Sequence, residues 1–218
     1  MNREMRKAKF QEVDIYPATC ERLSAGRSNL EVLQAVIQGG AGIIQLREKD
    51  YNARALYHLA LKFREITAKE GVLLIINDHL DIALVSGADG VHLGQEDLPL
   101  GAARKLAPEL LIGVSTHSRD EALQAQRDGA DYINIGPIFP TKTKQGVERS
   151  LGPEAISTIG KEINVPFTVM GGINENNLDE VLAAGAQRVA MVTAITQAAN
   201  ISATVSRLKE KIRRARST

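Results

Sequence analysis

Short apolar segments alternate with longer amphipathic segments along the whole chain, and this alternation constrains the fold more than any other feature. The short segments hold four to six residues and are rich in β-branched side chains, which is typical of buried strands. The longer ones have apolar residues spaced by three and four, which predicts helices that pack on one face. The predicted strands lie at 14–18, 43–46, 72–76, 90–93, 110–114, 132–135, 165–170 and 188–192.

Eight strands that alternate with helices predict an α/β protein, specifically a single-domain (β/α)₈ TIM barrel. A barrel of this kind usually needs about 200 to 250 residues, and the chain has 218. The alternative is a flat, doubly wound sheet, but eight units are many for an open sheet and no Gly-x-Gly-x-x-Gly turn follows the first strand. We expect the barrel over residues 13–218, preceded by a polar, basic and solvated extension over residues 1–12.

Charge and cysteine content restrict the partners and the compartment. Lys and Arg total 27 and Asp and Glu total 26, so no overall basic field attracts nucleic acid or a membrane surface. No apolar run approaches the roughly 20 residues that span a bilayer. The one cysteine, Cys20, cannot form an internal disulfide. We therefore predict a protein of the reducing cytoplasm whose ligands are small molecules. A homodimer is compatible with a barrel of this size.

Polar side chains gather where the predicted strands end. In a (β/α)₈ barrel the carboxyl ends of the strands meet at one rim, which is where active sites of this fold lie. The sequence thus predicts one polar site built from several strands. Its segments are 45–49 (Gln-Leu-Arg-Glu-Lys), 77–79 (Asn-Asp-His), 92–97 (His-Leu-Gly-Gln-Glu-Asp), 115–117 (Ser-Thr-His), 136–144 (Gly-Pro-Ile-Phe-Pro-Thr-Lys-Thr-Lys), 171–173 (Gly-Gly-Ile) and 192–194 (Val-Thr-Ala).

Two cations and two carboxylates in these segments suggest a magnesium-diphosphate site. Arg47 and Lys49 alternate with Glu48, so an extended backbone points both cations to one side, where they could bind a diphosphate. Asp78 and Asp97 follow neighbouring strands and suit Mg²⁺, which takes few protein ligands and completes its shell with water and phosphate oxygens. Ordinary surface charges are the alternative for the cations, and helix N-capping is the alternative for Asp78.

A second anion site is predicted on the same rim, after strands six and seven. The Gly171-Gly172 turn offers backbone N–H groups after strand seven, the usual phosphate seat of this fold. The polar loop with Thr141, Thr143 and Lys144 could donate hydrogen bonds to a second ligand or close over it. Two anion sites on one rim imply two phosphorylated substrates. His92 lies within an apolar strand, and we expect it to be a buried, hydrogen-bonded residue of the barrel interior.

These segments resemble the thiamine-phosphate synthase family in order and approximate spacing, over nearly the whole chain. The resemblance implies a TIM-barrel transferase that joins 4-amino-2-methyl-5-pyrimidinylmethyl diphosphate to a thiazole phosphate and releases pyrophosphate, with Mg²⁺ as cofactor. It implies catalytic roles for Arg47, Lys49, Ser115 and Lys144, and Mg²⁺ ligation by Asp78 and Asp97. The substrate-binding residues it implies are Gln45, Leu46, Arg47, Glu48, Lys49, Asn77, Ser115, Thr141, Lys142, Thr143, Lys144, Gly172, Val192 and Thr193.

The implied mechanism is dissociative. An electron-rich aminopyrimidine stabilises the cation left by C–O cleavage, so the protein mainly has to neutralise the departing diphosphate. His79, Thr193 and Met170 depart from the family pattern, and Met170 could narrow the thiazole side of the site. Two rivals remain: a thiazole tautomerase of the same barrel family, with His117 as general acid or base, and a non-catalytic barrel that binds a phosphorylated metabolite.

Overall fold

Eight parallel strands form the centre of the molecule in the computed structural model, which describes residues 1–141, 143 and 150–216. The strand order is β1-β8-β7-β6-β5-β4-β3-β2, and a parallel bridge from Ala18 to Gln45 links the two outer strands. The sheet is therefore a nearly closed barrel, and the predicted (β/α)₈ fold is confirmed. The strands are β1 (Ile15–Pro17), β2 (Ile43–Leu46), β3 (Leu73–Asn77), β4 (Gly90–Leu93), β5 (Leu111–Thr116), β6 (Tyr132–Ile135), β7 (Phe167–Val169) and β8 (Val189–Met191).

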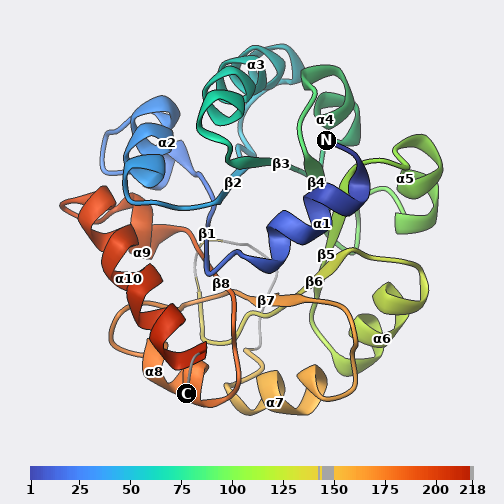
Figure 1. The fold of residues 1–218 in the computed structure, drawn as a ribbon, viewed down its shortest axis with the longest axis vertical. Helices are drawn as coiled ribbons and strands as arrows, with labels where there is room; N and C mark the ends of the chain where they lie inside the picture. Colours follow the sequence, from blue (N-terminus) through green and yellow to red (C-terminus); the bar gives the residue numbers. More distant parts are fainter. Residues whose placement is uncertain (142, 144–149, 217–218) are drawn as a thin grey trace.

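Helices surround the barrel as an outer ring (Figure 1). Their apolar faces and the outward side chains of the strands form one continuous core, which includes Leu46, Ile76 and Val91. Helix starts follow local capping chemistry: Ser28 and Glu31 form a capping box at the start of α2. The helices are α1 (Arg3–Gln11), α2 (Asn29–Gln38), α3 (Ala53–Glu70), α4 (Leu80–Ser86), α5 (Leu100–Leu106), α6 (Arg119–Arg127), α7 (Glu154–Gly160), α8 (Leu178–Ala183), α9 (Thr193–Thr196) and α10 (Ile201–Arg216), with a 3₁₀ turn, η1 (Glu21–Leu23).

The barrel interior changes character from one end to the other. Near the amino ends of the strands it is filled by apolar side chains such as Ile43, Leu73 and Leu111. Nearer the carboxyl ends the inward positions are polar and include Gln45, Asn77 and His92. Since strand side chains alternate between the two faces, these polar residues share the inward face with the apolar ones below them. The interior is thus closed at the bottom and able to bind polar groups at the top.

The expectation of a solvated extension before the barrel is wrong. Residues 3–11 form helix α1, which lies across the amino-terminal mouth of the barrel (Figure 1). Phe10 is only 1% exposed and stacks on the ring of Tyr132 with 4.3 Å between centroids. Arg3 and Arg6 bind Asp131 and Asp89, which directly precede β6 and β4. The polar composition of this segment reflects ion pairs with the barrel, and sequence periodicity does not reveal such partners.

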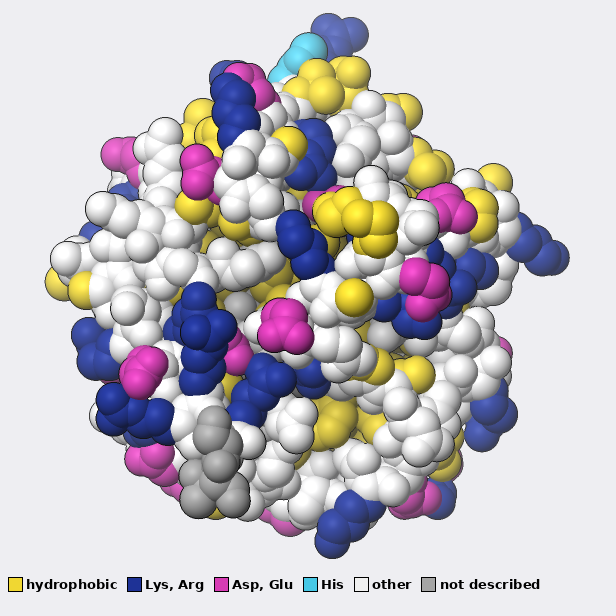
Figure 2. Space-filling view, viewed as in Figure 1, with side chains coloured by type: hydrophobic (Ala, Val, Ile, Leu, Met, Phe, Trp, Pro, Cys, Tyr) yellow, Lys and Arg dark blue, Asp and Glu magenta, His cyan; other side chains and the backbone are white. Residues whose placement is uncertain are grey.

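None of the helices in the described part of the chain combines the length and the apolar character needed to cross a membrane. On the amino-terminal face, Lys and Arg side chains are interspersed with Asp and Glu (Figure 2). This mixture fits the near-zero net charge of the chain.

Candidate active site

A cavity of about 370 Å³ opens at the carboxyl ends of the strands. Residues from most strand ends line it, as the fold requires of an active site. Twelve of the predicted site residues come together here, although they lie up to 148 positions apart in the sequence, from residue 45 to residue 193. They are Gln45, Arg47, Lys49, Asn77, Asp78, Asp97, Ser115, Thr141, Thr143, Gly172, Val192 and Thr193.

The two predicted metal ligands lie side by side on the cavity wall. Asp78 has φ of 63°, a left-handed conformation unusual for a residue other than glycine, and its backbone N–H donates to the His92 carbonyl at 2.8 Å. Its carboxylate forms an ion pair with Lys49. Helix α4 has His79 as its N-cap and no side-chain cap. The alternative of Asp78 as a helix cap is therefore not observed, and its strained backbone presents the carboxylate to the cavity.

Burial raises the pKa of Asp78, and the neighbouring Asp97 carboxylate raises it further, while Lys49 lowers it. Asp97 itself accepts a 2.6 Å hydrogen bond from the backbone N–H of Gly94. Two adjoining carboxylates with one lysine beside them leave negative charge that a cation would neutralise. Among the described residues, no three His, Cys, Asp or Glu side chains cluster as a metal site. An ion held here by Asp78 and Asp97 would need further ligands from substrate and water, which suits Mg²⁺.

The segment after β2 sends alternate side chains in opposite directions. Arg47 and Lys49 line the cavity, and the backbone N–H of Arg47 is held by Thr19 Oγ1 at 2.9 Å. Glu48 points away, and its carboxylate accepts hydrogen bonds of 3.1 and 3.2 Å from the Glu21 backbone N–H. Burial raises the pKa of Glu48 despite that bond. The two cations thus face the cavity together, while Glu48 holds the loop that follows β1.

Two of the predicted substrate-binding residues, Leu46 and Glu48, do not line the cavity, and their side chains face away from it. Leu46 is fully buried in the core between the strands and the helices. Side chains of an extended chain alternate between its two faces, and Leu46 and Glu48 each lie between residues that face inward. Their own side chains therefore face outward. Lys142 and Lys144 lie outside the described residues.

The Gly171-Gly172 turn lies on the opposite side of the cavity, after β7. Gly171 and Gly172 have φ of 106° and 63°. A Cβ on Gly171 would lie 2.4 Å from Cβ of Pro137, and one on Gly172 would lie 2.6 Å from the carbonyl oxygen of Pro140. Glycine is therefore required because the loop after β6 crosses this turn in contact. The packing leaves a side-chain-free edge at which backbone can approach a ligand.

Residues outside the predicted strand-end segments also line the cavity, including Asn134, Ala190 and Met191, together with Gln95 from the predicted segment 92–97. Gln95 Nε2 donates to the Ser115 carbonyl oxygen at 2.7 Å. Asn134 follows Tyr132 by two within β6, so both face inward. The sequence did offer a signal for Asn134, because it is a polar residue within an otherwise apolar strand. His92, expected as a buried and hydrogen-bonded residue, contacts Tyr132 and Ser115, so that expectation is confirmed.

The fold and the cavity define a TIM-barrel enzyme with its site at the carboxyl ends of the strands. Residues 15–195 match the family model described as thiamine monophosphate synthase. The chain is 47% identical over 204 residues to the thiamine-phosphate synthase of Pelotomaculum thermopropionicum, covering 93% of this chain and 94% of that one. It is 42% identical over 214 residues to the thiamine-phosphate synthase of Caldicellulosiruptor saccharolyticus, covering 98% and 97%.

A solved structure agrees with these relatives. Thiamine phosphate pyrophosphorylase from Pyrococcus furiosus superposes with a TM-score of 0.87 at 33% identity, over 97% of this chain and 98% of that chain. The chain belongs to the thiamine-phosphate synthase family, and it is an enzyme of the transferase class. The resemblance seen in the strand-end segments is thereby confirmed.

Proposed function

We propose that this enzyme joins 4-amino-2-methyl-5-pyrimidinylmethyl diphosphate to a thiazole phosphate and releases pyrophosphate. The C–O bond to the diphosphate breaks, and its electron pair leaves on the diphosphate oxygen. The thiazole nitrogen then donates its lone pair to the pyrimidinylmethyl cation and forms the new C–N bond. The products are thiamine phosphate and pyrophosphate, and the step needs neither an oxidant nor a covalent enzyme intermediate.

One observation supports this proposal most: a single cavity holds a cation and carboxylate cluster on the β2–β4 side and a glycine turn on the β7–β8 side. The first side suits a diphosphate with its metal ion, and the second suits a monophosphate. A cavity of about 370 Å³ is within the usual range for small-molecule sites. Both reactants can therefore be held on one rim, with their reacting atoms between the two anion sites.

On the diphosphate side, Arg47 and Lys49 bind the phosphate oxygens, and Gln45 and Asn77 contact the pyrimidine end. Asp78 and Asp97 hold Mg²⁺, which when bound neutralises charge on the leaving diphosphate. The two cations stabilise that charge as it develops, in a partly enclosed site where electrostatic interactions are stronger than in water. Ser115 contacts the pyrimidine or the departing pyrophosphate. Lys144 keeps its proposed catalytic role as a prediction from sequence.

On the thiazole side, Gly172 and Thr193 supply donors for the phosphate. Thr141 and Thr143 come from the loop after β6 and line the same cavity, as does Val192 after β8. The Arg47 guanidinium also donates a 3.5 Å hydrogen bond to the backbone carbonyl oxygen of Thr143. This bond connects the diphosphate side of the cavity to the thiazole side. Water competes with the thiazole nitrogen for the pyrimidinylmethyl cation. Enclosing both substrates keeps water away from that cation.

The test is turnover of the two substrates with and without Mg²⁺, for wild type and for Asp97→Ala. The matched control is Asp50→Ala, because Asp50 is exposed and pairs only loosely with Arg22 at 3.6 Å. We expect magnesium-dependent thiamine phosphate and pyrophosphate in wild type and in the control, and loss of both products in Asp97→Ala. Wild type that binds thiazole phosphate without forming product would instead support the tautomerase, tested by exchange of thiazole protons, or the non-catalytic barrel. Homodimer formation and a cytoplasmic location remain predictions from sequence.

A further inference from the structure

Beneath the cavity, a chain of hydrogen bonds crosses the barrel interior and joins two residues of its wall. Gln45 Nε2 donates to Tyr16 Oη at 3.1 Å, and Tyr16 Oη lies 2.9 Å from Tyr132 Oη. Tyr132 Oη lies 3.1 Å from His92 Nδ1, and His92 Nε2 lies 2.9 Å from Ser115 Oγ. Gln45, His92 and Ser115 line the cavity, whereas Tyr16 and Tyr132 lie below it.

The members of this chain are buried. The side chains of Tyr16 and Tyr132 belong to residues that are 1% and 0% exposed, and His92 is 7% exposed. Burial raises the pKa of both tyrosines far above their usual value. Each phenol therefore keeps its single proton, and each can donate one hydrogen bond only.

Counting protons determines the direction of the chain. Tyr16 accepts from the Gln45 amide, so its own hydrogen is free to be donated. Among the described residues, the acceptor that the structure offers to this hydrogen is Tyr132 Oη. Tyr132 then donates to His92 Nδ1, and a neutral ring that accepts at Nδ1 carries its proton on Nε2. That Nε2–H donates to Ser115 Oγ, and the Ser115 hydrogen is left to point into the cavity.

The reverse direction is unfavourable for a specific reason. If Tyr132 donated to Tyr16, the Tyr16 oxygen would accept two hydrogens while its own buried hydrogen lost its acceptor. A buried donor without an acceptor has lost its hydrogen bond to water and gains none in the protein, which destabilises the folded state. With the Gln45 amide in the orientation that the structure gives it, Nε2 toward Tyr16, one direction alone therefore satisfies every proton in the chain.

We propose that Tyr16, Tyr132 and His92 are positioning residues that hold the Ser115 hydroxyl as a hydrogen-bond donor toward the substrate. At the other end, the side-chain amide oxygen of Gln45, Oε1, can act as an acceptor for the substrate. The cavity wall thus offers an acceptor at Gln45 and a donor at Ser115, and the aminopyrimidine ring of the proposed substrate carries both an amino donor and ring-nitrogen acceptors. This reading of the substrate rests on the proposed function, whereas the direction of the chain does not.

Packing holds the rings in place. Phe10 from α1 stacks on Tyr132, and the His92 ring lies 5.5 Å from the Tyr132 ring at an interplanar angle of 29°. A Cβ on Gly113 would lie 2.0 Å from Cζ of Tyr132, so only glycine leaves room for this ring inside the barrel. Helix α1, which lies at the far mouth of the barrel, therefore supports a residue two hydrogen bonds away from the Ser115 hydroxyl.

The first test is independent of activity. ¹⁵N–¹H correlation spectra of the histidine rings report which nitrogen carries the proton, and the His92→Asn variant identifies the His92 signals among the four histidines. We expect neutral His92 with its proton on Nε2 in wild type at pH 7, and a shift toward the Nδ1–H form in Tyr132→Phe. A wild-type ring with its proton on Nδ1 would overturn the proposal, even if the protein had no synthase activity.

The second test is kinetic and uses a double-mutant cycle. We expect Tyr132→Phe to raise KM for the pyrimidine diphosphate about fivefold, the effect of one hydrogen bond, and to leave KM for the thiazole phosphate unchanged. In a Ser115→Ala background the same substitution should change neither value. The matched control is Thr116→Val, which removes a buried β5 hydroxyl that donates to the Asn134 carbonyl instead. Equal losses from Tyr132→Phe in both backgrounds, or an equal rise in both KM values, would show a merely structural role and overturn the proposal.

Discussion

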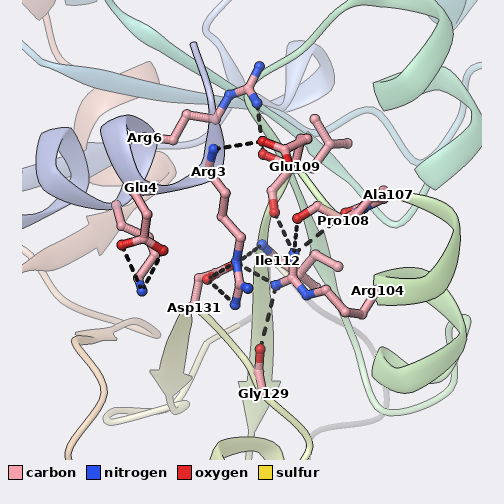
Figure 3. Close-up of polar contacts among 12 residues, drawn as sticks. Arg3, Glu4, Arg6, Arg104, Ala107, Pro108, Glu109, Ile112, Gly129 and Asp131 are labelled. Atoms are coloured by element: carbon pink, nitrogen blue, oxygen red, sulfur yellow. Dashed lines mark hydrogen bonds and ion pairs between the residues drawn. The ribbon is translucent and has the colours of Figure 1, made fainter.

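The two ends of the barrel use the same residue type in opposite ways. At the amino-terminal end, Asp131 is 3% exposed and accepts hydrogen bonds from Arg3, Arg104 and the backbone N–H of Ile112, at 2.8, 2.5 and 2.8 Å (Figure 3). Asp89 has the same arrangement two β/α units earlier, with Arg6, Arg64 and the backbone N–H of Leu74. These carboxylates are saturated with donors, and each connects a helix to the start of a strand.

At the carboxyl-terminal end, Asp78 and Asp97 adjoin one another in the cavity. Asp78 has Lys49 as its cationic partner, Asp97 has a backbone N–H, and the pKa of Asp78 is raised. The difference shows how a buried aspartate can be interpreted. Where arginines and strand amides satisfy it, the carboxylate stabilises the fold, and where a second carboxylate adjoins it, it is suited to bind a cation.

The largest expected effect separates the two ends through catalysis. Asp78→Asn should lower turnover of the proposed substrates about a thousandfold, roughly 4 kcal/mol of transition-state stabilisation, because the diphosphate loses its metal ion. Without Mg²⁺ its free energy of unfolding should match or exceed that of wild type, since one of two adjoining charges is removed. Steady-state kinetics and urea titration measure the two quantities. A variant that unfolds easily while keeping its turnover would place Asp78 with the structural aspartates.

The second effect is the counterpart at the other end. Asp131→Asn should lower the free energy of unfolding by about 3 kcal/mol, because Arg3 and Arg104 lose their buried partner charge. The folded variant should keep kcat/KM within about twofold of wild type, since Asp131 lies at the mouth opposite the cavity. Urea unfolding and kinetics on the same preparation decide the question. A large loss of kcat/KM at full stability would break the division between the two ends.

A third prediction concerns the region that joins the two ends. Gly113→Ala should lower the free energy of unfolding by about 2 kcal/mol, because the new methyl group displaces the Tyr132 ring in a packed interior. It should also raise KM for the pyrimidine diphosphate, as Tyr132 supports His92. Gly101→Ala is the control, since nothing lies within 4 Å of a Cβ there. Stability lost without any change in KM would indicate that packing and ligand binding are uncoupled at this position.

The smallest expected effect distinguishes the cavity from its surroundings. Glu48→Gln should keep turnover within about threefold, because Glu48 binds the Glu21 backbone and does not face the substrate. Burial raises the pKa of Glu48 in the folded protein, so folding favours the protonated carboxyl. The stability of wild type relative to Glu48→Gln should therefore fall as pH rises from about 4.5, the ordinary value for glutamate. Urea midpoints of the two proteins between pH 4 and 7 test this pH dependence. In the kinetic test, a large loss of substrate affinity in Glu48→Gln would show that Glu48 does contribute to substrate binding.

The sequence by itself determined the barrel fold, the rim at which the candidate active site lies and the protein family. Strand and helix periodicity is local, so eight alternating units are visible without any contact, and parallel strands bring their carboxyl ends to one edge whatever the details of packing. This is why Arg47, Asp78 and Gly172 could be assigned to one cavity from sequence alone. The alternation that assigned Arg47 and Lys49 to one side also determined that Glu48 lies on the other.

Only the tertiary structure decided which residues meet across the barrel. Tyr16 and Tyr132 are 116 positions apart, and Arg3 and Asp131 are 128 positions apart. Their contacts depend on closure of the barrel, on strand register and on the placement of α1, none of which has a local pattern in the chain. A helix of mostly polar residues looks solvated in sequence, but in the folded protein its arginines find buried carboxylates and its one buried side chain, Phe10, packs beneath the ring that leads to the cavity.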